Sequence, residues 1–378
     1  MAFEHYIRSG TKLLRCGYTT GTCAALAAAG AATMLLTGET PETVRLCTPK
    51  GITVEVALAD CKRGENAASC AVRKDGGDDP DVTDGLLISA EVRLTEHGIS
   101  IDGGAGVGRV TKAGLDQPVG AAAINTVPRQ MIAATVESVC AETGYSGGLA
   151  VTISVPGGAE AAAKTFNPIL GIEGGISILG TSGIVEPMSE QAIVDTIAVE
   201  LHQAALGDRS GLLLTPGNYG IQFIQEMSPD LPRLPCVKYS NYLGDALDIA
   251  AMEGFPCVLI VGHIGKLVKL AGGIMNMHSK MADCRRELFC AYAALCGAGQ
   301  EVCRKLMEQV TTDGCIAVLD ENGLRQPVMK SLIDAMQRHL DRRAAGAMRV
   351  GVVVFSNEYG LLGQSEAGET LLREWSAQ

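Results

Sequence analysis

The chain has 378 residues, more than one hydrophobic core usually serves, so two domains are expected. A net charge of −11 with 4% aromatic residues argues against nucleic-acid binding, which needs basic patches and stacking faces. The 47% of hydrophobic residues indicate a globular protein. The 13 cysteines are an odd number without a CxxC pair, which predicts reduced thiols and a cytoplasmic protein.

The first half of the chain predicts an α+β domain, because Gly-rich turns alternate with short strands. An Ala-rich apolar run at residues 23–36 is too short to span a bilayer and predicts a core helix that Gly38 ends. Period-two alternation predicts the strands. They are expected at residues 43–46, 52–58, 86–94 and 147–155.

The second half predicts a doubly wound α/β domain with a mostly parallel sheet. A helix is expected at residues 189–205, where apolar residues recur every four positions. Strands are expected at residues 212–215, 235–239, 257–261 and 350–355. Helical patterns between the strands imply parallel crossovers. The Pro- and Gly-rich stretch 156–187 contains the boundary, which we set at residue 170, giving domains 1–170 and 171–378.

Two polar motifs stand out in the first half. Thr19, Thr20 and Thr22 lead into the Ala-rich helix, whose free N–H groups could attract a carboxylate or phosphate. An ordinary N-cap explains the same pattern. The turn at residues 75–84 holds five carboxylates, which repel one another and raise some pKa values unless cations or N–H donors are near. A solvated acidic turn is the usual outcome, but glycines and Asp79-Pro80 fix this backbone.

A third motif is the Gly-rich segment 103–108, which Arg109 and Lys112 follow. It has the pattern GxGxGR from Gly104 and so lacks the last glycine of a dinucleotide fingerprint. A loop that lets the backbone approach a ligand and a bare turn explain it equally well.

The loops after the first three strands of the second half should share one crevice, because ligands bind outside the carboxyl ends of parallel strands. These loops are residues 215–220, 240–245 and 262–266. The third loop lacks the Walker A spacing, which weakens a phosphate-hydrolysing role. The segment 263–286 is basic and could attract an anion or form a solvated helix face.

Together these segments resemble the CbiD family, the cobalt-precorrin-5B C1-methyltransferases of anaerobic cobalamin biosynthesis. The similar stretches are GYTTGTCAALAAAGAA, KDGGDDPDVTDG, GGAGVGRVTKAGL, GGISILGTSGIVEPMS, TPGNYG, KYSNYLGDAL and VGHIGKLVKLAGGIMNMHS, spread over residues 17–279. Each stretch alone is weak, and their number and order carry the resemblance.

The resemblance implies S-adenosylmethionine as methyl donor and cobalt-precorrin-5B, a tetrapyrrole with acetate and propionate arms, as acceptor. The product would be cobalt-precorrin-6A. Because the cobalt belongs to the substrate, we expect no metal site in the protein itself. We expect no nucleic-acid or membrane partner, and a homo-oligomer is one option that the sequence leaves open.

The resemblance also directs the site predictions. We expect the donor to contact Gly217, Asn218, Tyr219, Gly220, Ser240, Asn241, Asp245 and Gly262. We expect the carboxylate arms of the acceptor to contact Thr19, Thr20, Thr22, Arg109, Lys112, His263, Lys266, Lys269 and His278. We expect Asp78, Asp79 or Asp81 to act in catalysis by stabilising the sulfonium or the charge that develops on the ring.

Two other functions remain open from the residues alone. A small-molecule phosphotransferase is consistent with Gly-rich loops before helices, and Mg-dependent ATP binding would favour it. A non-catalytic tetrapyrrole carrier would bind the ring but not S-adenosylmethionine. The missing Walker A motif weakens the first alternative, and the few aromatic residues weaken the second.

Overall fold

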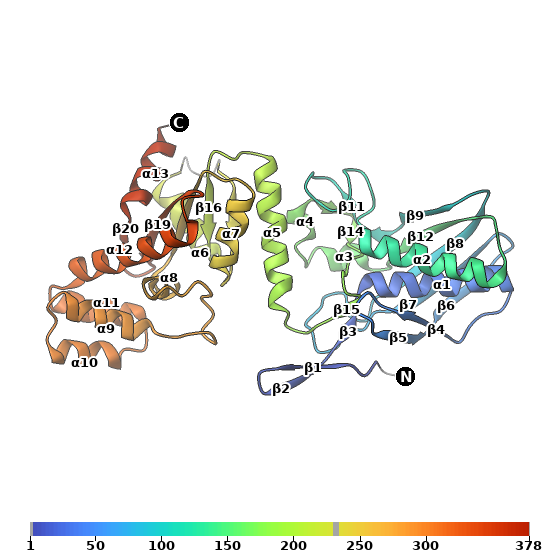
Figure 1. Cartoon of the computed structure of the whole chain (residues 1–378), viewed down its shortest axis with the longest axis horizontal. Helices are drawn as coiled ribbons and strands as arrows, with labels where there is room; N and C mark the ends of the chain where they lie inside the picture. The colour runs from blue at the N-terminus through green and yellow to red at the C-terminus, as the bar shows by residue number, and fades with distance from the viewer. Residues whose placement is uncertain (1–2, 230–233, 378) are drawn as a thin grey trace. The chain divides into compact units, whose positions relative to one another are not determined.

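The computed structural model describes residues 3–229 and 234–377. The chain forms two compact units, unit 1 (Met1–Glu190) and unit 2 (Gln191–Gln378), each with helices and sheets (Figure 1). The boundary lies later than the expected residue 170. The reason is that three short strands beyond residue 170 pair with strands of unit 1. They are β13 (Ile172–Glu173) with β11 (Arg109–Val110), β14 (Gly175–Ile176) with β10 (Gly106–Val107), and β15 (Ile184–Val185) with β3 (Gly17–Tyr18).

Unit 1 is built on a five-stranded mixed sheet in the order β6-β7-β8-β12-β9. These strands are β6 (Ala59–Arg63), β7 (Ala67–Arg73), β8 (Leu87–Thr95), β9 (Ile99–Gly103) and β12 (Gly148–Ser154). The predicted strands at 86–94 and 147–155 are confirmed, and those at 43–46 and 52–58 are β4 (Thr43–Cys47) and β5 (Thr53–Ala57), which pair as an antiparallel hairpin. Unit 1 also contains β1 (Tyr6–Ser9), β2 (Lys12–Arg15), α3 (Gly158–Ala162) and α4 (Asn167–Leu170).

Helix α1 (Thr20–Thr37) is the core helix of unit 1. It packs on β7 and β8 beside α2 (Thr126–Thr143), as Figure 1 shows. By length and composition α1 could cross a membrane, but 83% of it is buried inside the structure. Its many alanines explain this burial, since small side chains let sheet and helix approach closely. Gly38, with a φ of 84°, ends the helix as predicted.

Unit 2 contains a five-stranded sheet in the order β17-β16-β18-β19-β20. Its strands are β16 (Leu212–Thr215), β17 (Cys236–Lys238), β18 (Cys257–His263), β19 (Arg349–Ser356) and β20 (Gly360–Gln364). The first four in the sheet order are parallel, and β20, which the sequence did not predict, is antiparallel to β19. Neighbouring residues of β16 face opposite sides: Leu213 packs into one apolar cluster, and Leu212 and Leu214 into the other.

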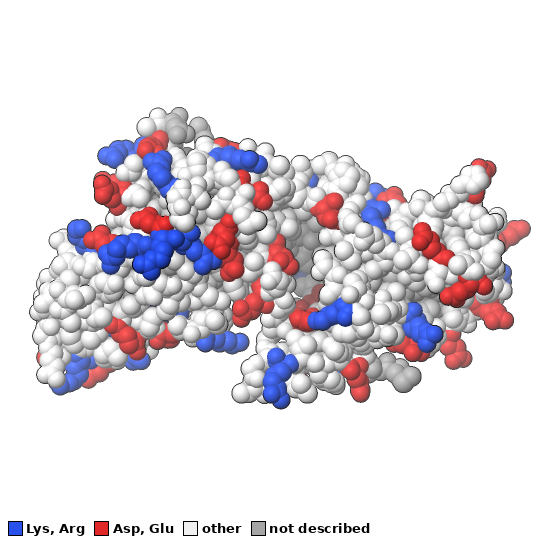
Figure 2. Space-filling model, in the orientation of Figure 1, with Lys and Arg blue, Asp and Glu red and all other residues white. Residues whose placement is uncertain are grey.

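Helices contribute to both of these clusters. α5 (Glu190–Leu206), α7 (Leu243–Met252) and α12 (Arg325–Ala344) supply residues to one, and α6 (Asn218–Met227) and α13 (Glu366–Ser376) to the other. Between β18 and α12 come α8 (Ile264–Leu267), a 3-10 helix (Val268–Gly272), α9 (Arg285–Leu295), α10 (Gln300–Glu308) and α11 (Thr312–Glu321). On the face drawn in Figure 2, the basic side chains of unit 2 gather over α12, whereas those of unit 1 are scattered.

Candidate functional site

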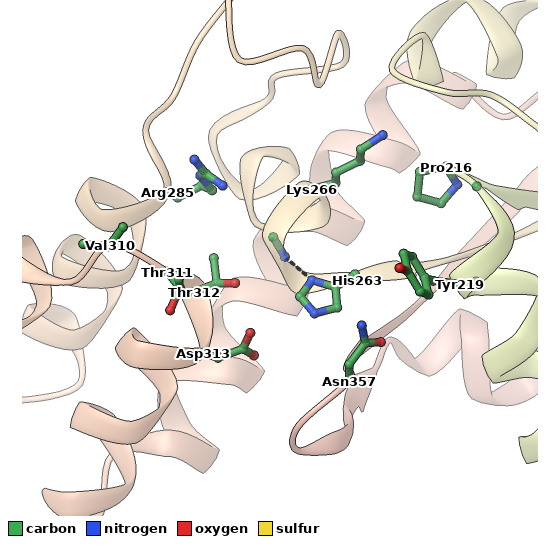
Figure 3. A pocket seen from close by; sticks show the side chains of 13 residues that line it. Pro216, Tyr219, His263, Lys266, Arg285, Val310, Thr311, Thr312, Asp313 and Asn357 are labelled. Carbon is green, nitrogen blue, oxygen red and sulfur yellow. Dashed lines mark hydrogen bonds between the residues drawn. The ribbon is translucent and has the colours of Figure 1, made fainter.

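A cavity of about 580 Å³ lies in unit 2 at the carboxyl ends of the parallel strands (Figure 3). Its wall includes Pro216, Tyr219, His263, Lys266, Arg285, Asp313 and Asn357. The first and third predicted loops therefore share a crevice, as expected. The second loop is not part of the wall, although the Ser240 carbonyl accepts a hydrogen bond of 3.1 Å from Lys266 Nζ.

His263 ends β18 and caps α8. Its Nδ1 accepts a hydrogen bond of 3.0 Å from the Gly265 N–H, drawn dashed in Figure 3. The proton of the neutral imidazole must therefore be on Nε2. Burial lowers the pKa of His263, and the nearby Asp313 carboxylate offsets part of that shift. At neutral pH the ring is thus an uncharged hydrogen-bond donor, held edge-on against Phe355.

Lys266 is half-buried in the wall of the cavity. Burial lowers its pKa, and the charge of Lys269 lowers it further. Nζ donates to the Ser240 carbonyl, and Lys266 forms no salt bridge with a residue in 3–229 or 234–377. Ser240 has a φ of 55°, a left-handed conformation that is uncommon outside glycine, so this hydrogen bond holds an unusual turn.

Thr311, Thr312, Asp313 and Asn357 of the wall were missed by the sequence predictions, whereas Arg285 belongs to the predicted basic segment 263–286. Arg285 forms a two-pronged ion pair with Asp283, with both distances 2.7 Å. Asp313 Oδ1 accepts a hydrogen bond of 2.5 Å from the Ser356 hydroxyl, and Asn357 follows β19. A signal for Asn357 was present, because the strand at 350–355 was predicted to be parallel and its loop should have joined the crevice. Asp313 follows the Thr311 N-cap of α11, which looks like any helix start.

A second cavity of about 300 Å³ shares part of this wall. Arg285, Thr311 and Thr312 line both cavities, and Arg286 and Cys315 line only the smaller one. Burial raises the pKa of the Cys315 thiol to about 11, so it is protonated at neutral pH.

The glycines of the first loop differ in what they permit. A side chain at Gly217 would meet open space, so the backbone is accessible there. A Cβ at Gly220 would lie 2.7 Å from the Val261 carbonyl oxygen and 2.9 Å from Thr215 Cβ. Gly220, which lines the cavity, is therefore also needed for α6 to pack on β18. A Cβ at Gly262 would press on Leu267 in the same way.

The remaining predicted residues of unit 2 lie outside the walls of both cavities. They are Asn218, Ser240, Asn241, Asp245, Gly262, Lys269 and His278. Asn218 Oδ1 accepts a hydrogen bond of 3.2 Å from Lys238 Nζ. Lys269 is 3% exposed and donates to the Met277 carbonyl at 3.0 Å, which fixes the segment after the 3-10 helix. His278 Nδ1 accepts the Lys280 N–H.

The acidic turn of unit 1 is held together by internal donors. Asp78 accepts the Arg15 N–H at 2.7 Å, and Asp79 accepts the Met188 N–H at 2.9 Å. Asp81 pairs at 2.8 Å with Lys74, whose side chain is 1% exposed. Burial alone would raise the pKa of Asp81, but the Lys74 ammonium and Thr83 outweigh it and the pKa is lowered. The carboxylates thus fix this turn, a structural role that the sequence did not predict.

A neighbouring carboxylate of the turn is paired in the same manner. The Asp75 carboxylate forms two hydrogen bonds with the Arg15 guanidinium, at 2.6 and 2.8 Å. This pair lowers the pKa of Asp75, against a smaller opposing effect of burial. The Arg15 guanidinium therefore offsets part of the repulsion between carboxylates that the sequence predicts for this turn.

The three threonines at the start of α1, of which Thr19 is the N-cap, are buried. Thr19 Oγ1 accepts the Thr22 N–H at 3.2 Å, the ordinary N-cap. Thr20 Oγ1 accepts the Leu179 N–H at 2.9 Å, and Thr22 Oγ1 donates to the Gly183 carbonyl at 2.7 Å. Hydrogen bonds therefore join the start of α1 to the segment before β15, whose carbonyl groups accept from its N–H and hydroxyl donors.

The Gly-rich segment 103–108 lies close to other backbone of unit 1. A Cβ at Gly106, whose φ is 76°, would collide with the Val155 carbonyl oxygen. Arg109 pairs with Asp102 at 2.9 and 3.0 Å. Lys112 Nζ donates to the Ile169 carbonyl at 2.9 Å. Both predicted side chains thus have partners within unit 1 and lie outside the two cavities of unit 2.

Comparisons with known proteins agree with one another. A family model described as CbiD matches residues 7–187, and one described as CbiD, C-terminal domain, matches residues 276–366. The cobalt-precorrin-5B C(1)-methyltransferase of Ruminiclostridium cellulolyticum is 48% identical, over 94% of this chain and 92% of that protein. The protein of the same name from Alkaliphilus metalliredigens is 44% identical over 97% of both chains. A crystal structure of cobalamin biosynthesis protein cbiD from Archaeoglobus fulgidus is 33% identical, with a TM-score of 0.40 over 73% of this chain and 86% of that one.

Proposed function

We propose, since the chain belongs to the CbiD family, that it methylates C1 of cobalt-precorrin-5B with S-adenosylmethionine as donor, giving cobalt-precorrin-6A. The observation that carries this proposal is the 48% identity to a methyltransferase of that name over nearly the whole of both chains. The cavity at the strand ends of unit 2 supports it, because 580 Å³ lies within the range of about 300–1,000 Å³ typical of small-ligand pockets.

The bound donor supplies a methyl group on a sulfonium, whose S–C bond breaks with its electron pair left on sulfur while the ring carbon forms the new C–C bond. The task of the protein is then to hold the two reactants close and aligned, which can lower a barrier by about 7–11 kcal/mol. Gly217, Tyr219, His263 and Lys266 are our candidates for contacts with the donor, because they line one cavity.

The carboxylate arms of the acceptor have a different candidate site. Arg286 lines the smaller cavity and donates to the Met307 carbonyl, without a salt bridge to any described residue of 3–229 or 234–377. A guanidinium matches a carboxylate in shape and charge. We therefore assign acetate or propionate arms to the smaller cavity, next to the donor.

Two finer points belong to the same proposal. We class unit 2 as a doubly wound α/β domain, because helices contribute to the apolar clusters on both sides of its four parallel strands. We also propose that the enzyme works in the cytoplasm as a soluble protein, on the basis of its many thiols.

Calorimetric titration with S-adenosylhomocysteine tests the proposal, with Mg-ATP as the control ligand. We expect saturable micromolar binding of the first and none of the second. Transfer of a labelled methyl group from S-adenosylmethionine to cobalt-precorrin-5B should follow. Binding of Mg-ATP alone would point to a phosphotransferase, and binding of the tetrapyrrole without S-adenosylhomocysteine, even with both present, would point to a carrier.

A further inference from the structure

The larger cavity contains two opposite charges without counter-ions. Asp313 is the only carboxylate among its described wall residues, and no lysine or arginine within 3–229 or 234–377 forms an ion pair with it. Of the two cations in the wall, Arg285 is paired with Asp283 and Lys266 binds only the Ser240 carbonyl. Lys266 and Asp313 also form no ion pair with each other, so they are more than 4.0 Å apart.

Half-buried charges without partners are costly, and proteins usually pair them. The neighbouring groups do not neutralise Asp313: the Ser356 hydroxyl occupies Oδ1 without removing the charge. His263, which lies beside Asp313 in Figure 3, is held in its neutral form because Nδ1 accepts the Gly265 N–H. The cavity therefore suits a ligand that carries a positive and a negative group separated along its length.

We propose that Asp313 faces the sulfonium of the methyl donor and that Lys266 binds the carboxylate of its methionine end. The inference rests on the proposed function and deepens it by fixing the direction of the donor in the cavity. It also assigns the recognition of the sulfonium charge to unit 2. The acids first predicted for that role, Asp78, Asp79 and Asp81, are bound to donors within unit 1.

Methyl transfer removes the positive charge from sulfur, so a carboxylate at Asp313 would bind the charged donor more tightly than the neutral product. Coulomb attraction between a charge pair near a protein surface is large enough to change affinity by about ten-fold. Asp313 would thereby help the enzyme to exchange product for fresh donor.

Binding of three probes tests the proposal in the whole protein without turnover. S-adenosylmethionine and sinefungin carry a cation at the centre of the molecule, whereas S-adenosylhomocysteine does not. For Asp313→Asn we expect about ten-fold weaker binding of the two cationic probes and unchanged binding of S-adenosylhomocysteine. The charge-matched control is Asp334→Asn, on the exposed side of α12, which should change none of the three.

A fourth probe tests the other end of the donor. Methylthioadenosine lacks the amino-acid group. Lys266→Gln should therefore weaken the binding of S-adenosylhomocysteine by about ten-fold and leave the binding of methylthioadenosine unchanged. Lys330→Gln, at an exposed position of α12, is the control. The inference would be overturned if either variant lost the same affinity for all of its probes, or lost no affinity for any of them. If the unaltered protein binds none of the probes, with or without the corrinoid, the proposed function itself fails.

Discussion

Units 1 and 2 use their polar sequence motifs in opposite ways. In unit 1, the acidic turn, the threonines at the start of α1 and the residues after the Gly-rich segment all bind partners inside the unit. In unit 2, Lys266, Asp313 and the Nε2 of His263 line a cavity without a charged partner. The contrast teaches that a dense polar motif can build a fold, while a functional site is indicated by charged groups that the fold leaves without a counter-ion.

The largest expected effect concerns the buried ion pair of unit 1. Asp81→Ala leaves the Lys74 ammonium buried without a counter-charge, and we expect a loss of about 3 kcal/mol, the lower end of the range for breaking a buried pair. Hydrogen exchange of peptides from β7 and β8 measures the loss in unit 1. Fluorescence of Trp375, the single tryptophan, monitors unit 2 in the same sample.

Glu91→Ala is the matched control for Asp81→Ala. Its partner Arg93 is exposed, so solvent screens the pair and its loss should leave stability almost unchanged. If Asp81→Ala were as stable as Glu91→Ala and yet abolished methyl transfer, Asp81 would act in catalysis. The acidic turn of unit 1 would then not be purely structural.

A smaller effect is expected at the start of α1. Thr22→Val keeps the shape of the side chain and removes the 2.7 Å hydrogen bond to the Gly183 carbonyl, which still accepts the Thr19 N–H. We expect a loss of about 1 kcal/mol in unfolding free energy. The KM for cobalt-precorrin-5B should not change, because the hydroxyl is buried.

Thr37→Val makes the same replacement at the exposed end of α1 and should be close to neutral. A raised KM in Thr22→Val with unchanged stability would show that the helix start binds the acceptor after all. Both quantities can be measured on one preparation by chemical denaturation and steady-state kinetics.

Several elements of both units, though not α2 or β20, could be predicted because their signals are local. The alternation in β8 and the Ala-rich run of α1 depend only on neighbouring residues. The roles of the polar residues depend on partners far along the chain. Thr20 meets Leu179, and Asp79 meets Met188, each through backbone groups that no side-chain pattern reveals. Asp313 was missed because no local pattern marks it: only the folded sheet brings the start of α11 to the end of β19.

The smallest expected effect concerns the protonation of His263. Burial lowers its pKa in the folded protein, so the unfolded chain binds a proton first as the pH falls. The stability contributed by the neutral ring is complete above the unfolded value of about 6.5 and is lost as the pH falls below it. Protonation would also break the hydrogen bond that Nδ1 accepts from Gly265.

His263→Asn isolates this effect, because asparagine can cap α8 with its side-chain oxygen but does not titrate near neutral pH. Between pH 7.5 and 5.5, the unfolding midpoint followed by Trp375 fluorescence should fall more steeply in the unaltered protein than in His263→Asn. Identical slopes would mean that folding does not change the pKa of His263. A midpoint that rises, relative to His263→Asn, as the pH falls would mean that the folded protein holds the ring protonated. Its charge would then offset that of Asp313, and the contrast between the paired carboxylates of unit 1 and the unpaired charges of the cavity in unit 2 would weaken.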